Sequence, residues 1–284
     1  MAGSGTGIER IESGGVTCLR AGAGNGPHLV LVHGIGSNAE SFVPLIERLS
    51  GAFDVLAWNA PGYVDSTPLE KEWPSASDYA QSLAALMDRL GIPRAAILGH
   101  SLGALVAGRF TVLHPQRVAT LILSSPALGN GAVPGQPLPA TAAARLDGLI
   151  TEGAAQFAAS RAPNLVFRKD NGALVAAVTE AMSKIKLPGY AHAVRMLACG
   201  DLIADAAAIG VSTLVLVGDR DAVTQPADCR RVYDALCAAT PNLDHRFALV
   251  PDAGHAVAQE APDEVAKLVA GWLTSHAGTL KNAE

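Results

Sequence analysis

One serine lies between an apolar run and a helix-like stretch of small residues, in the segment ILGHSLGALVAG (residues 97–108). Its neighbours form the pattern G-x-S-x-G, with Gly99 and Gly103 on either side of Ser101. Where this pattern joins a strand to a helix, the sharp turn exposes the serine hydroxyl at the carboxyl edge of a sheet. The preceding AAILG predicts the strand and LGALVAG predicts the helix. We therefore predict that Ser101 is a nucleophile on a strained turn.

A serine hydroxyl needs a base that takes its proton. Among eight histidines, His255 follows the last predicted strand, in VPDAGHAVAQE, where the base lies when the order is Ser, acid, His. The segment TLVLVGDRDAVT offers Asp219 and Asp221 as the orienting acid. The G-x-x-D spacing favours Asp221, which would accept a hydrogen bond from one imidazole nitrogen and leave the other free for the serine proton.

Acyl transfer also needs donors aimed at the oxyanion of the tetrahedral intermediate. The backbone N–H of Leu102 is one candidate, and that of Ile35, in the HGIGSN loop after the first long strand, is the second. This loop is otherwise simply a turn, and His33 is expected to hold it by hydrogen bonding. His100 is too close in sequence to fold back onto Ser101 as its base, so we treat it as a candidate substrate contact.

Apolar runs rich in β-formers alternate with helical patterns, which is typical of a mostly parallel sheet with helices on both faces. Two short runs around Gly14 and Gly15 predict an N-terminal hairpin. The helix at 77–91 is expected to begin with Ser77 as its N-cap and to stop at Gly91. Strands are predicted at 28–33, 53–59, 95–99, 118–125, 213–218 and 245–250, and helices at 77–91, 101–114, 226–238 and 262–276.

No clear strand appears between residues 129 and 206, a length too great for a plain connection. We predict a helical insertion there, and a core formed by residues 1–128 and 207–284. Cations outnumber acids in the insertion, which most simply indicates a solvated face. An inward-facing cation, Arg195 being our candidate, would instead bind a substrate carboxylate. Between residues 161 and 195 the cations are Arg161, Arg168, Lys169, Lys184, Lys186 and Arg195, against Asp170 and Glu180.

Composition narrows the classes of function. The 284 residues are 49% hydrophobic and 17% charged with a net charge of -5, which is typical of a globular chain and disfavours nucleic acid as a partner. The four cysteines lack C-x-x-C spacing, so we expect no metal and no cofactor. MAGSGTG resembles no secretion signal, and charged residues and glycines interrupt the apolar stretch 95–114. We expect a cytoplasmic protein without stable membrane association, and its oligomeric state, monomer or homodimer, stays open.

The motifs HGIGSN, GHSLG, GDRDAV and DAGHAVAQEAP occur in the order seen in the α/β-hydrolase superfamily, which the chain resembles from about residue 8 to 276. The resemblance implies the α/β-hydrolase fold, a mostly parallel twisted sheet flanked by helices, with residues 129–206 as a helical lid over the active site. It assigns the same triad and oxyanion donors, Ser101, Asp221, His255, Ile35 and Leu102.

Two residues depart from the family pattern. Asn59 stands where many relatives carry Asp, and Val64 stands where many carry Gly in a P-G-x-G-x-S run. A β-branched residue does not easily adopt positive φ, so we expect the loop around Val64 to differ. Ser101 at the turn argues against dehalogenases and epoxide hydrolases, which carry Asp there.

Three functions are compatible with these motifs. The first is hydrolysis of a small-molecule carboxylic ester or lactone through an acyl-enzyme. The second is C–C bond hydrolysis of vinylogous diketone acids, and the third is a non-enzymatic ligand receptor on the same fold. The first is the leading hypothesis, with a small molecule as the partner.

Overall fold

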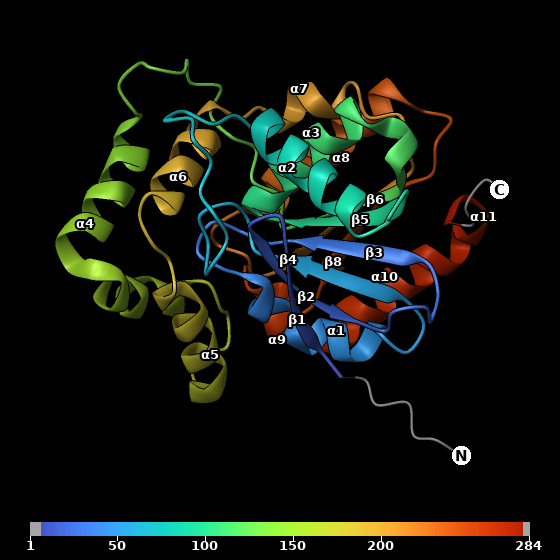
Figure 1. Cartoon of the computed structure of the whole chain (residues 1–284), viewed down its shortest axis with the longest axis horizontal. Coiled ribbons are helices and arrows are strands. Elements are labelled where there is room, and N and C mark those ends of the chain that lie inside the picture. The colour runs from blue at the N-terminus through green and yellow to red at the C-terminus, as the bar shows by residue number, and fades with distance from the viewer. Residues whose placement is uncertain (1–6, 281–284) are drawn as a thin grey trace.

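A mixed eight-stranded sheet forms the centre of the molecule, whose residues 7–280 are described by a computed structural model (Figure 1). The strand order is β1-β2-β4-β3-β5-β6-β7-β8, antiparallel for the first two pairings and parallel for the rest. The predicted mostly parallel sheet and N-terminal hairpin are confirmed. The strands are β1 Glu9–Ser13, β2 Val16–Ala21, β3 His28–Val32, β4 Asp54–Trp58, β5 Ala95–His100, β6 Val118–Ser124, β7 Thr213–Gly218 and β8 His245–Val250.

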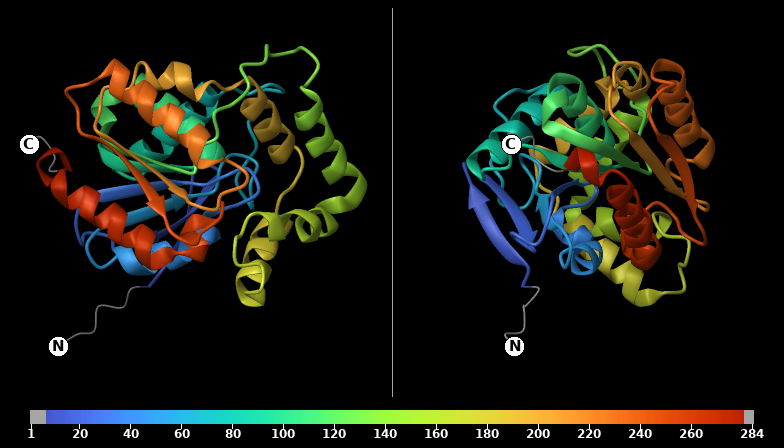
Figure 2. Two further views of the ribbon diagram at one scale, coloured as in Figure 1. Left: turned by 180° about the vertical axis from the view of Figure 1, so that it is seen from behind. Right: turned by 90° about the vertical axis from the view of Figure 1, so that its right-hand side faces the viewer.

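Helices cover both faces of this sheet (Figure 2). On one face α2, α3 and α8 bury apolar side chains such as Leu83 and Val232, and on the other α1 and α10 bury Ile46 and Val269. The helices are α1 Val43–Leu49, α2 Ala76–Arg89, α3 Leu102–Leu113, α4 Ala140–Arg161, α5 Gly172–Ser183, α6 Gly189–Cys199, α7 Leu202–Ala206, α8 Pro226–Ala239, α9 Val257–Glu260, α10 Pro262–Ser275 and α11 Ala277–Leu280.

The start of α2 differs from the prediction. Ser77 lies inside the helix, and Ser75 is the N-cap. The backbone N–H of Ser75 donates to the Asp78 carboxylate at 2.8 Å, which fixes the helix start two residues earlier than expected. At the other end, Gly91 lies just beyond the helix at φ +66°, the left-handed conformation that favours glycine after a helix.

The segment between β6 and β7 carries helices α4, α5 and α6, which we call the cap, and they stand over the carboxyl ends of the parallel strands (Figure 1). Helix α4 is kinked at Gly153, which has φ 73°. Helix α7 instead packs against α3 and α8 of the core. The domain limits at 128/129 and 206/207 remain predictions.

Within residues 7–280, no helix has the length and apolar character needed to cross a membrane. The N-terminal stretch that we assessed for a secretion signal falls almost entirely on residues 1–6, which lie outside the described range.

Candidate active site

Ser101 occupies the sharp turn between β5 and α3, with φ 53° and ψ −116°. The flanking glycines are required by close packing. A Cβ on Gly99 would lie 2.4 Å from the Gly103 carbonyl oxygen, and one on Gly103 would lie 2.1 Å from the Val32 carbonyl oxygen. The strained turn predicted from G-x-S-x-G is therefore present, and it holds the serine at the carboxyl edge of the sheet.

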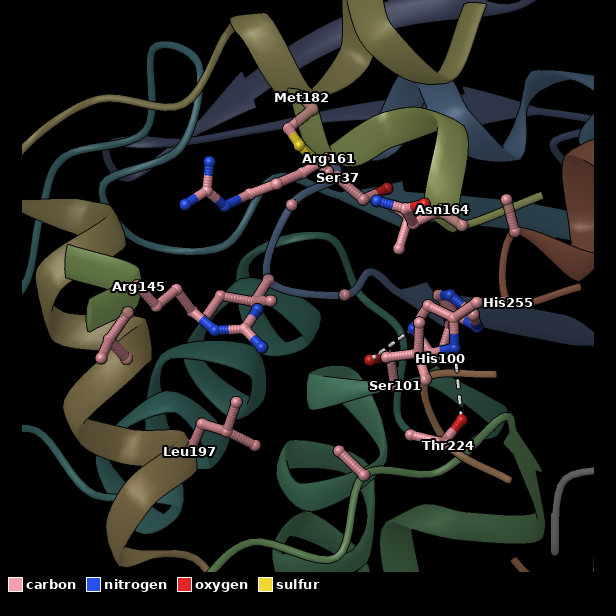
Figure 3. Close-up of a pocket in the computed structure, with 18 of the residues that line it drawn as sticks. Ser37, His100, Ser101, Arg145, Arg161, Asn164, Met182, Leu197, Thr224 and His255 are labelled. Atoms are coloured by element: carbon pink, nitrogen blue, oxygen red, sulfur yellow. Dashed lines mark hydrogen bonds between the residues drawn. The ribbon is translucent and has the colours of Figure 1, made fainter. Parts of the chain in front are cut away.

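The three predicted triad residues lie in one hydrogen-bonded chain, of which Figure 3 shows the contact between Ser101 and His255. The Ser101 Oγ is 3.0 Å from the His255 Nε2, and the His255 Nδ1 is 2.9 Å from the Asp221 Oδ2. Asp221 follows β7 and His255 follows β8, so parallel neighbouring strands bring both to the edge that carries Ser101. All three side chains are buried. In this arrangement Nδ1–H donates to the carboxylate, and Nε2 is free to accept the hydroxyl proton.

Asp221 is held as an anion by several donors. Its Oδ1 accepts from the backbone N–H groups of Val223 and Thr224 at 2.8 and 2.9 Å, and its Oδ2 accepts from the Thr224 hydroxyl at 3.0 Å. Burial alone would raise the pKa of Asp221, but the hydrogen bonds and the charge of His255 lower it to about 2. Sequence reasoning missed Thr224, although its position three residues after the acid was a local signal.

The loop after β3 approaches Ser101 closely. A Cβ on Gly34 would lie 3.1 Å from the Ser101 Cβ, so a larger residue would crowd this contact. Within residues 7–280, neither the Ile35 N–H nor the Leu102 N–H donates to another protein group. Both backbone donors are thus available beside Ser101, and their role as oxyanion donors remains a prediction.

His33 and Tyr63 hold this loop in place. The His33 Nδ1–H donates to the Gly34 carbonyl at 2.8 Å, and the His33 Nε2 accepts from the Ala60 N–H at 3.0 Å. The predicted structural role of His33 is confirmed. Burial lowers its pKa to about 4, so the ring stays neutral. The Tyr63 hydroxyl donates to the Ile35 carbonyl at 2.7 Å.

A cavity of about 830 Å³ lies between the core and the cap, and Ser101 and His255 line its core side (Figure 3). This volume is that of a small-molecule site. His100 also lines it, with its ring centroid 5.0 Å from that of His255. Burial and the nearby His255 lower the pKa of His100 to about 3, so it presents a neutral ring. His100 therefore lies at the cavity wall, and its role as a substrate contact remains a prediction.

The sequence of the chain matches a known family over most of its length. A family model described as "Serine aminopeptidase, S33", a family of hydrolases, matches residues 26–262. The chain belongs to this α/β-hydrolase family. The resemblance drawn from the motifs and the predicted fold are confirmed.

Known proteins similar to this α/β hydrolase have different activities. It is 29% identical over 281 residues to the dihydrolipoyllysine-residue acetyltransferase component of the acetoin cleaving system of Pseudomonas putida, covering 94% of the chain and 70% of that protein. It is 32% identical over 128 residues, 44% of either chain, to the 2-hydroxy-6-oxononadienedioate/2-hydroxy-6-oxononatrienedioate hydrolase 2 of Pseudomonas putida. The enol-lactonase of Burkholderia xenovorans LB400 shares its fold, with a TM-score of 0.80 at 24% identity, covering 94% of this chain and all of that one.

The structure of this α/β hydrolase does not bring Arg195 into the cavity. Its guanidinium donates to the Glu72 carbonyl at 2.7 Å, lies 3.4 Å from the Glu72 carboxylate and stacks over the Trp73 ring. The cap arginines that line the cavity are Arg145 and Arg161. Arg145 was not among our candidates, because no motif distinguishes it within the insertion.

The two departures from the family pattern have structural explanations. The Asn59 amide accepts from the Ala39 N–H at 2.9 Å and donates to the Thr17 hydroxyl at 3.0 Å, a combination that an aspartate cannot provide. The expectation that Val64 avoids positive φ is wrong, since its φ is 53°. The turn around it is closed by neighbouring hydrogen bonds, and the Val64 carbonyl accepts from the Lys186 ammonium of the cap at 2.9 Å.

A second buried carboxylate ties the cap to the loop of His255. Glu260, in α9, accepts from the backbone N–H of Gly254 at 2.7 Å, directly before His255. It also accepts from the N–H groups of Phe167 and Arg168, in the cap segment after α4, at 3.1 and 2.7 Å. The side chain is fully buried. Sequence reasoning missed Glu260, because its cap partners lie more than ninety residues away.

Proposed function

We propose that this α/β hydrolase cleaves a small-molecule carboxylic ester or lactone through an acyl-enzyme. The observation that carries the proposal is the chain of hydrogen bonds from Ser101 through His255 to Asp221, open to a cavity of small-molecule size. The enol-lactonase that shares the fold adds support.

The proposed reaction assigns a group to each step. The His255 Nε2 takes the hydroxyl proton as the Ser101 Oγ attacks the scissile carbonyl carbon, and Asp221 stabilises the resulting imidazolium. The Ile35 and Leu102 N–H groups stabilise the oxyanion. His255 then protonates the departing alcohol oxygen, and in the second half it activates a water molecule that releases the acid and frees Ser101.

The test is ester turnover in the wild type and in Ser101→Ala. We expect hydrolysis of p-nitrophenyl butyrate to fall at least roughly 10⁴-fold in this variant, because the nucleophile is lost. A phosphonate directed at serines should label residue 101 in the wild type. Ser183→Ala, at the exposed end of α5, is the matched control and should keep both activity and labelling. Turnover that survives in Ser101→Ala, or labelling elsewhere, would refute the proposal.

A second candidate is hydrolysis of a C–C bond in a vinylogous diketone acid. It is favoured by the 32% identity, over 128 residues, to a hydrolase whose name describes an oxo-dienedioate substrate. Loss of colour from a ring-fission product, abolished by Ser101→Ala, together with no ester turnover, would favour this candidate. Ligand binding without turnover of either class would favour a receptor.

A further inference from the structure

The charges around the cavity do not balance. The side chains with a permanent charge that line it are Arg145, Arg161, Asp228 and Arg231. Arg161 lies 3.1 Å from the Glu152 carboxylate, and Arg231 lies 3.4 Å from Asp228. In the part of the chain that the structure describes, no carboxylate oxygen lies within 4 Å of the Arg145 guanidinium.

Arg145 lies on the first half of α4 and directs its guanidinium into the cavity, on the side opposite Ser101 and His255 (Figure 3). The wall beside it is largely apolar and is formed by α6, with Tyr190, Val194 and Leu197 among the lining residues. Burial raises the pKa of Tyr190, and the charge of Arg145 and its contact with the Tyr190 hydroxyl oppose that increase, so the cation lies against this wall. An unpaired cation beside apolar surface loses hydration that an anionic ligand can replace.

Arg161 shows what a structural arginine looks like in the same helix. Its guanidinium stacks 3.8 Å over the Phe157 ring and pairs with Glu152, and the kink at Gly153 folds it back toward Gly148. Arg145 has neither an aromatic platform nor a carboxylate partner among the described residues. Apart from a contact with the Tyr190 hydroxyl, its flat fork of N–H donors remains free to bind two oxygens of a ligand side by side.

We propose that Arg145 binds a carboxylate of the substrate, at the end of the molecule distant from the bond that Ser101 attacks. The inference rests on the proposed function and specifies its substrate class, the monoesters of dicarboxylic acids and lactones that carry a free carboxylate. The chemistry proceeds at one side of the cavity, and the cap selects the acidic substrate at the other.

The test compares esters that differ only in the distant carboxylate. Mono-p-nitrophenyl adipate carries it on the acyl side, and p-nitrophenyl hexanoate is its neutral counterpart. 4-Butyryloxybutanoate carries it on the alcohol side, and butyl butyrate is its neutral counterpart. We expect the wild type to prefer the acidic member of one pair. Arg145→Met should lower kcat/KM for that ester roughly tenfold to a hundredfold, as loss of a charge-assisted hydrogen bond does, with a much smaller change for its neutral counterpart. The preference should weaken as salt rises.

Arg195→Met is the matched control, because Arg195 is a cap arginine outside the cavity, and it should preserve the preference. Equal kcat/KM for both members of each pair, or equal losses on both in Arg145→Met, would overturn the inference while the proposed function stands. If the wild type cleaves no ester, calorimetry with adipate tests Arg145 alone. Adipate binding that is lost in Arg145→Met would support the carboxylate site even without esterase activity. Absence of adipate binding to the wild type would overturn the carboxylate site.

Discussion

At the carboxyl ends of the strands, each proposed catalytic residue lies in a short motif that follows a strand, whereas side chains far apart in sequence tie the cap to the core. Asp221 is fixed by the N–H groups of Val223 and Thr224. The cap is tied down by contacts such as that of the Asn38 amide with the Ala181 carbonyl at 3.0 Å, across 143 residues. We infer from this difference that the proposed reaction and the proposed choice of substrate depend on separately built parts, so a change in one should leave a distinct kinetic signature.

The largest effect should come from changing a residue of the candidate triad at the strand ends. Asp221→Asn keeps the shape of the acid but removes the charge that orients and stabilises the His255 ring. We expect kcat to fall roughly 10³- to 10⁴-fold, with KM nearly unchanged because the cap is untouched. Steady-state kinetics on p-nitrophenyl butyrate measures both constants. Asp219→Asn, which changes the neighbouring acid that does not contact His255, is the control and should retain near-normal activity. A large rise in KM in Asp221→Asn would contradict the inference that the strand ends and the cap act separately.

The candidate triad was predictable because each of its residues belongs to a short sequence motif. The elbow around Ser101, the acid after the strand at 213–218 and the base after that at 245–250 each follow from a short motif at a strand end. Parallel strands bring such ends to one edge of a sheet. Those two strands have the predicted bounds. Even here local rules failed once, because hydrogen bonds of the surrounding turn hold Val64 at a φ that its side chain disfavours.

The contact between core and cap was not predictable in the same way. Arg145 is one of several cations in a helical insertion, and only the kinked path of α4 shows that it faces the cavity while Arg195 does not. Glu260 looks like an ordinary helical acid, since its partners at Phe167 and Arg168 lie far away in sequence. Periodicity identifies the insertion as helical, but it does not determine which side chains meet across it.

Glu260 contacts both the His255 loop and the cap, so changing it should give the next largest effect. We expect stability, kcat and KM to change together. Glu260→Gln replaces one acceptor oxygen by an NH₂ group that faces a backbone N–H. We expect a loss of about 1–3 kcal/mol in unfolding free energy from the unsatisfied buried groups. We also expect a roughly tenfold lower kcat, because the Gly254–His255 loop loses an anchor, and a higher KM, because the cap segment loosens.

The control for Glu260→Gln is Glu264→Gln in α10, whose carboxylate pairs only with Lys267 at the surface among the described residues. Denaturant unfolding and steady-state kinetics on both variants measure the effects. If Glu260→Gln lost stability with kcat and KM both unchanged, Glu260 would be a purely structural residue, and core and cap would be uncoupled at this point.

The smallest effect concerns pH and again belongs to the core. The His33 ring is buried and neutral, with a pKa lowered by burial to about 4, whereas the unfolded chain binds a proton near pH 6.5. Between these values the unfolded state is protonated and the folded state is not, so stability falls as pH drops below about 6.5. From pH 7 to pH 5 this linkage amounts to about 2 kcal/mol. Denaturant unfolding at the two pH values measures the loss.

His33→Gln isolates this contribution, because an amide keeps one donor and one acceptor for the Gly34 and Ala60 backbone but does not titrate. His100, also neutral with a pKa lowered to about 3, contributes with the same sign in both proteins and cancels in their comparison. We therefore expect the pH-dependent loss to be about 2 kcal/mol smaller in His33→Gln than in the wild type. Equal losses in the two proteins would mean that the loop after β3 does not depend on a neutral His33, and that this part of the core is less firmly fixed by its local contacts than Asp221 is.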